Sequence, residues 1–115
     1  MAYRIIIAGI GPGHPDYVLP AARRAIEKAT VLVGGRRALA DFAQEGQEKI
    51  PIMGDIPAVM TALHEHLKKH DVVVMVSGDP GYYSLLDAIR REFPPESFSV
   101  IPGISAVQFA FARLA

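Results

Sequence analysis

The chain of 115 residues contains no cysteine, and its twelve basic residues are balanced by twelve acidic ones. Without cysteine, neither a disulfide framework nor a thiolate metal site can form. The absence of a net charge and of any run of like charges disfavours binding to nucleic acid or to an anionic membrane surface. We therefore expect a cytoplasmic protein that binds neither nucleic acid nor membrane.

Long apolar runs are also missing. The apolar segment at residues 3–10 is too short to span a bilayer, and glycine and proline follow it. It also lacks the charged start and the cleavage pattern of a signal peptide. Half of the residues are nevertheless hydrophobic, which is enough for one domain with a buried core.

Short apolar segments alternate with amphipathic ones along the chain. Strands are predicted at residues 3–9, 30–33, 49–53, 72–76 and 97–101. The segments 3–9 and 72–76 are apolar on both faces, which is typical of a parallel sheet covered by helices. Helices are predicted to begin near Pro20, Arg36, Asp55 and Asp79-Pro80. This order predicts an α/β fold, a three-layer α/β/α domain with a mostly parallel sheet of about five strands.

The carboxyl end of the chain carries a further amphipathic segment. From residue 104 to 115, an apolar face runs to the last residue without glycine, proline or a polar tail; it consists of Ile104, Val107, Phe111 and Leu114. We therefore expect residues 1–115 to be the amino-terminal domain of a longer protein whose carboxyl-terminal domain is absent. An apolar face left uncovered also favours self-association.

Turns rich in glycine and proline follow three of the expected strands. They lie at residues 9–13 (GIGPG), 77–80 (SGDP) and 102–106 (PGISA). In open α/β sheets ligands bind beyond the carboxyl ends of the strands, and glycine lets a ligand approach the backbone. A structural interpretation is open for each turn, since Asp79 and Ser105 are also suitable helix caps. Three such turns at one edge favour a ligand site.

Several common site patterns are absent. The first turn matches a dinucleotide fingerprint at Gly9 and Gly11, but His14 stands at the third glycine position. No phosphate loop of the Gly-Lys-Ser/Thr type occurs, and no Ser/His/Asp or paired-carboxylate set stands out. His66 and His70 are four residues apart on one expected helix, which is a ligand spacing, but no third ligand joins them. We therefore expect no metal site.

Two arginines, Arg36 and Arg37, follow a pair of glycines at the end of the expected strand 30–33. The glycines let the chain turn, and the guanidinium groups are suited to a substrate rich in carboxylates. A solvent-exposed helix face explains the same two residues equally well, so both interpretations stay open.

These motifs, in this order, resemble those of the tetrapyrrole (corrin/porphyrin) methylase family. The matching segments are residues 9–13, 33–36 (VGGR), 77–80 and 101–105 (IPGIS). Within the family, residues 78–84 (GDPGYYS) and 102–108 (PGISAVQ) are most similar to the enzymes that methylate C5 of a precorrin or cobalt-precorrin. The resemblance implies a longer, two-domain protein that forms a homodimer and holds S-adenosyl-L-methionine in the cleft between its domains.

The resemblance also implies roles for individual residues. The cofactor would be lined by Pro12, Ser77, Gly78, Asp79, Tyr82, Ser105 and Ala106. The tetrapyrrole substrate would contact Gly11, Arg36, Arg37 and Tyr83. Methyl transfer from a sulfonium to a nucleophilic ring carbon depends mainly on alignment, so no catalytic side chain and no metal is assigned.

The function that we expect is S-adenosylmethionine-dependent methyl transfer to C5 of a precorrin macrocycle in cobalamin biosynthesis. This chain would supply half of the cleft and would be inactive alone. One alternative is another enzyme of the same family, acting on a different ring carbon or on RNA, although the neutral charge disfavours RNA. The other alternative is a non-catalytic nucleotide-binding or dimerisation module.

Overall fold

The computed structural model describes residues 3–11, 18–77 and 82–101. Five strands form one sheet in the order β3-β2-β4-β1-β5, and all neighbouring strands are parallel. The strands are β1 (Ile5–Gly11), β2 (Val31–Gly34), β3 (Glu48–Pro51), β4 (Val72–Ser77) and β5 (Phe98–Ile101). The predicted α/β fold with a parallel sheet is therefore confirmed.

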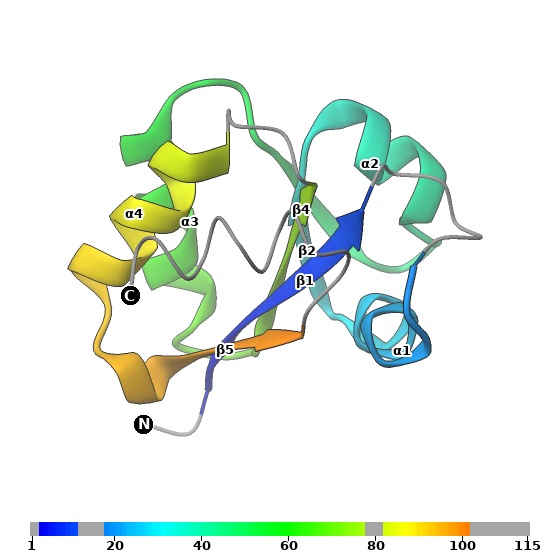
Figure 1. The fold of residues 1–115 in the computed structure, drawn as a ribbon, viewed down its shortest axis with the longest axis horizontal. Coiled ribbons are helices and arrows are strands. Elements are labelled where there is room, and N and C mark those ends of the chain that lie inside the picture. Colours follow the sequence, from blue (N-terminus) through cyan, green and yellow to red (C-terminus); the bar gives the residue numbers. More distant parts are fainter. Residues whose placement is uncertain (1–2, 12–17, 78–81, 102–115) are drawn as a thin grey trace.

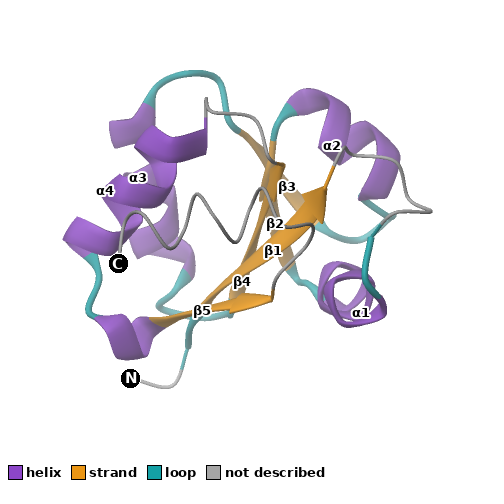
Figure 2. Ribbon diagram, viewed as in Figure 1, coloured by secondary structure: helices purple, strands orange, loops and turns teal. Residues whose placement is uncertain are grey.

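Helices cover both faces of this sheet, as Figures 1 and 2 show. On one face lie α1 (Pro20–Lys28) and α2 (Arg36–Phe42), and on the other lie α3 (Ile56–His66) and α4 (Tyr83–Glu92). A short 3-10 helix, η3 (Pro95–Ser97), leads into β5. The result is the predicted three-layer arrangement. No helix in the described ranges is long and apolar enough to cross a membrane.

Each face of the sheet has its own apolar core. The core under α3 and α4 includes Ile5, Ile7, Val72, Val74, Leu63 and Ile89. The core under α1 and α2 includes Ala8, Leu32, Val73, Met75, Ala22 and Ile26. Alternate residues of β4 enter opposite cores, and all residues from Val72 to Val76 are buried. This explains the unbroken apolar run of that segment.

Helix α3 begins where the sequence predicts. The Asp55 carboxylate accepts a hydrogen bond from the backbone N–H of Ala58 at 3.1 Å, and Pro57 occupies the first turn. The four residues predicted for its apolar face are all buried: Val59, Met60, Leu63 and Leu67. Capping and periodicity are local properties, so the sequence was sufficient to predict where this helix begins and which face of it is buried.

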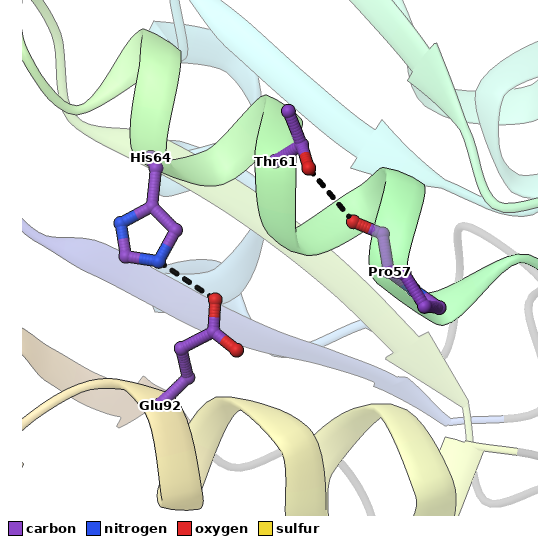
Figure 3. Close-up of polar contacts among 4 residues, drawn as sticks. All are labelled: Pro57, Thr61, His64 and Glu92. Carbon is purple, nitrogen blue, oxygen red and sulfur yellow. Dashed lines mark hydrogen bonds and ion pairs between the residues drawn. The ribbon is translucent and has the colours of Figure 1, made fainter.

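Helices α3 and α4 also meet at the surface (Figure 3). His64 Nε2 lies 2.7 Å from Glu92 Oε2, and the imidazole stacks on Phe93 with ring centroids 4.5 Å apart. One turn earlier in α3, the Thr61 hydroxyl donates to the Pro57 carbonyl at 3.1 Å. Exposed ion pairs contribute only about 0–1 kcal/mol, so the buried faces of the two helices dominate their packing.

Some element boundaries differ from the prediction. Strand β1 continues to Gly11 instead of ending at residue 9, because Gly11 pairs with Ser77 across a register shift. Strand β3 ends at Pro51, earlier than predicted, and proline has no N–H to continue a ladder. The described part of α4 begins at Tyr83. The predicted start at residues 79–80 and the predicted helix at 104–115 lie outside the described residues.

Candidate functional site

The strands all point the same way, so their carboxyl ends lie at one edge of the sheet, which we call the carboxyl edge. Here Gly11 at the end of β1 pairs with Ser77 at the end of β4. Gly34 at the end of β2 pairs with Pro51 at the end of β3, and β5 ends at Ile101. The strand ends that precede the predicted turns therefore lie at a common edge, as the sequence indicated.

Strand β4 and its two neighbours in the sheet are followed by helices on different faces. Strands β1 and β2 lead to α1 and α2 on one face, whereas β4 leads to α4 on the other (Figure 2). The connection that follows β4 therefore covers one face of the sheet, and the connections that follow its two neighbours cover the other face. Ligands of open α/β sheets bind at such positions, so the topology assigns the candidate site to the carboxyl ends of β1, β4 and β2.

Gly11 has a backbone conformation that suits this position. Its φ is 61°, a value that glycine adopts readily and that other residues rarely adopt. The register between β1 and β4 also shifts between Gly9 and Gly11. Irregularities of this kind often redirect the chain near binding sites. The ladder between β1 and β4 is therefore irregular near the end of β4, where a ligand is expected.

Tyr82, the N-cap of α4, lies beside the β2–α2 turn. It packs against the core under α3 and α4. Gly35, however, is the N-cap of α2 on the opposite face, and a Cβ there would lie 3.2 Å from the Tyr82 hydroxyl oxygen. The Tyr82 side chain therefore reaches across the carboxyl edge. The sequence indicated only that Gly35 allows a turn, because no spacing rule reports the approach of so distant a residue.

The arginines predicted for substrate binding begin α2. Arg36 and Arg37 are exposed, and none of the acidic residues that the structure describes forms an ion pair with them. The first turn of α2 contains no acidic residue. The helix dipole disfavours cations at an amino terminus, so helix stability does not explain why two arginines are here.

The remaining predicted site residues divide into two groups. Ser77 ends β4 and Tyr83 begins α4, and both are half-buried. The others lie outside the described residues: Pro12, Gly78, Asp79, Ser105 and Ala106. The structure thus brings Gly11 next to Ser77 and Tyr82 next to Gly35, and the binding roles of all these residues stay predictions.

The prediction that His66 and His70 share one helix is wrong. Helix α3 ends at His66, because the N–H groups of Lys68 and Lys69 donate to carbonyls three residues earlier and tighten the chain. His66 Nε2 instead lies 3.3 Å from Glu48 Oε2. Within the described ranges, no three residues of the metal-binding types cluster together.

Comparison with known proteins relates the chain to a family of enzymes. Residues 4–115 match the family model described as tetrapyrrole (corrin/porphyrin) methylases. The cobalt-precorrin-7 C(5)-methyltransferase of Salmonella typhimurium is 37% identical over 109 residues, which cover 95% of this chain and 54% of that protein. A probable cobalt-factor III C(17)-methyltransferase of Methanothermobacter thermautotrophicus is 37% identical, covering 96% of this chain and 33% of that protein.

Solved structures agree with this relationship. The methyltransferase CobJ has a TM-score of 0.69 and 31% identity, covering 97% of this chain and 51% of that chain. A uroporphyrin-III C-methyl transferase from Thermus thermophilus, complexed with S-adenyl homocysteine, has a TM-score of 0.58 and 25% identity over 88% of this chain and 45% of that one. The chain spans about half the length (54%) of the first curated relatives that it matches. It belongs to the tetrapyrrole (corrin/porphyrin) methylases.

Proposed function

We propose that this chain is the amino-terminal domain of an S-adenosylmethionine-dependent C-methyltransferase that acts on a tetrapyrrole. The observation that carries the proposal is the pairing of Gly11 with Ser77 at the carboxyl edge. These residues end β1 and β4, the neighbouring strands whose following helices cover opposite faces of the sheet. The Thermus thermophilus neighbour is complexed with S-adenyl homocysteine, the demethylated form of this cofactor. This chain covers only 54% of the length of two relatives, which supports a second domain that completes the cleft.

The cofactor is assigned to the β1 and β4 ends of the carboxyl edge. Its lining residues would be Pro12, Ser77, Gly78, Asp79, Tyr82, Ser105 and Ala106. Methyl transfer from a sulfonium depends on holding the methyl carbon and the ring carbon in line and close together, which is a role that lining residues without a catalytic side chain can fill.

The tetrapyrrole is assigned to Gly11, Arg36, Arg37 and Tyr83. Guanidinium groups bind carboxylates with paired hydrogen bonds, and the acidic side chains of a precorrin present several carboxylates. A cation in the first turn of a helix is disfavoured by about 0.3–1 kcal/mol. Binding of an anionic substrate therefore explains the two arginines better than helix stability does.

We propose C5 of a precorrin as the methylated carbon, in cobalamin biosynthesis. The identity to the C(5)-methyltransferase of Salmonella typhimurium supports this choice, as does 32% identity to a probable enzyme of the same activity from Methanocaldococcus jannaschii. The C(17) relative matches at the same 37% identity as the Salmonella protein. C17 is therefore the second candidate.

We also propose that the protein forms a homodimer and that the isolated chain self-associates. Strand β5, at the edge of the described sheet, is half-buried and contains neither charge nor proline. The other edge strand, β3, is protected by Glu48, Lys49 and Pro51 in the way typical of edges that face solvent. Sedimentation velocity of the isolated chain over a range of concentrations should show self-association. A monomer at every concentration would contradict the proposed self-association.

Titration calorimetry of the chain with S-adenosylmethionine, S-adenosylhomocysteine and NAD tests the cofactor assignment. We expect binding of the first two and none of NAD, and binding of NAD alone would refute the proposal. Gly78→Val should abolish cofactor binding and leave the far-ultraviolet circular dichroism unchanged. Unchanged affinity in this variant would remove residue 78 from the site.

The methylated carbon and the arginines require the full-length protein and a precorrin substrate. Transfer of an isotope-labelled methyl group, followed by NMR of the product, should place the label at C5. Label at C17 would favour the second candidate, and no transfer would refute the enzyme assignment. Arg36→Gln and Arg37→Gln should raise the KM for the precorrin, whereas Arg24→Gln, an exposed arginine of α1, should not.

A further inference from the structure

The close approach of Tyr82 to Gly35 accounts for a glycine that no other feature of the described residues requires. Gly35 has φ −64° and ψ 162°, a conformation open to any residue. Its backbone therefore does not need glycine. What distinguishes the position is space: a Cβ at residue 35 would lie 3.2 Å from the Tyr82 hydroxyl oxygen, closer than an ordinary van der Waals contact.

Helix capping explains only part of the choice of Gly35, because glycine is a favoured N-cap residue but accepts no side-chain hydrogen bond. It occupies the N-cap of α2, where serine, asparagine or aspartate would accept a hydrogen bond from the N–H groups of the first turn. Helix α2 has no such side-chain cap. A glycine at this position thus forgoes a capping interaction, and the nearby phenol is the described feature that a side chain would disturb.

The position of Tyr82 affects the segment assigned to the cofactor. Tyr82 is the N-cap of α4 and packs against the core under α3 and α4. It follows residues 77–80 (SGDP) by only two positions along the chain. Because Tyr82 is itself assigned to the cofactor, a displacement of its ring changes the lining of that site directly.

We propose that Gly35 is a positioning residue for the cofactor site and that it acts through Tyr82. The inference rests on the proposed function. The space at residue 35 lets the phenol of Tyr82 lie across the carboxyl edge, beside the β2–α2 turn. Because Arg36 and Arg37 follow Gly35 directly, the same contact sets the spacing between the methyl donor and the groups assigned to the substrate.

Two substitutions separate positioning from capping. Gly35→Ala and Gly35→Ser add the same Cβ, but serine is a much better N-cap than alanine and also at least as good as glycine. The phenol must move by a few tenths of an ångström in both variants. Because the displaced phenol is assigned to the cofactor, we expect the Kd for S-adenosylmethionine to rise about threefold to tenfold in both, roughly the loss of one contact. Stability to urea should fall in the alanine variant and not in the serine variant.

The same substitutions in a Tyr82→Phe background test whether Tyr82 is the intermediary. Phenylalanine lacks the hydroxyl oxygen that the new Cβ would approach, so neither change at residue 35 should alter the Kd further. A Kd that rises only in the alanine variant would reduce Gly35 to a capping role and overturn the inference. An equal rise in the Tyr82→Phe background would also overturn it. Failure of the full-length protein, with Gly35 and Tyr82 unchanged, to bind S-adenosylmethionine would instead refute the proposed function before any variant is compared.

Discussion

The end of β2 packs so closely on β4 that one added methyl group at residue 34 should destabilise the protein. Gly34 is buried, and a Cβ there would lie 2.7 Å from Met75 Cε and 3.6 Å from Ala38 Cβ. Met75 is a residue of β4, and it is fully buried in the core under α1 and α2. Its terminal methyl group has no solvent to move into, so Gly34→Ala has to displace this flexible end of the Met75 side chain within the core.

The expected loss follows from two opposing contributions. Adding a methyl group to a filled core costs about 1–3 kcal/mol. Replacing glycine by alanine restricts the unfolded chain and stabilises by about 0.4–1 kcal/mol where the backbone permits, and Gly34 has no positive φ. The net destabilisation of Gly34→Ala should therefore lie between about 0 and 2.6 kcal/mol, with a central value of about 1.3 kcal/mol.

Urea unfolding followed by circular dichroism measures this loss. Met75→Ala alone should cost about 2–5 kcal/mol, but it removes the methyl group that the new Cβ meets. In that background Gly34→Ala should be neutral or stabilising, so the two changes should be coupled by about 1–3 kcal/mol. If Gly34→Ala costs the same amount with and without Met75, this contact is not the cause and the reasoning is refuted.

Three further changes can be measured by the same unfolding assay. Gln47→Ala removes side-chain bonds of 2.7 and 3.0 Å to two carbonyls at the end of α1 and should cost about 1–3 kcal/mol; exposed Gln44→Ala is the control and should cost little. Asp55→Ala should cost about 0.5–2 kcal/mol by removing the α3 cap, which Asp55→Asn should retain; equal losses in both would argue against capping. Leu63→Ala, fully buried under α3, should cost about 2–5 kcal/mol, and a loss below about 1 kcal/mol would contradict its tight packing.

Elements governed by local rules were predictable from the residues. The apolar run of β4 indicated a central parallel strand, and its burial confirms this. The cap and apolar spacing of α3 predicted its start and its buried face. The end of α3 was less predictable, because the N–H groups of Lys68 and Lys69 donate to carbonyls three residues earlier and α3 ends at His66. No residue pattern distinguishes such a tightened turn from another turn of helix.

Periodicity, capping residues and turn motifs alone determined the fold class, the order of the elements and the resemblance to a family, because each depends on residues close together in the chain. Only the packing of two cores on one sheet decided which distant residues meet. It pairs Gly11 with Ser77 and brings the phenol of Tyr82 against Gly35. These contacts depend on which strands are neighbours and on which face each helix covers, and the spacing of residues along a chain does not record either one.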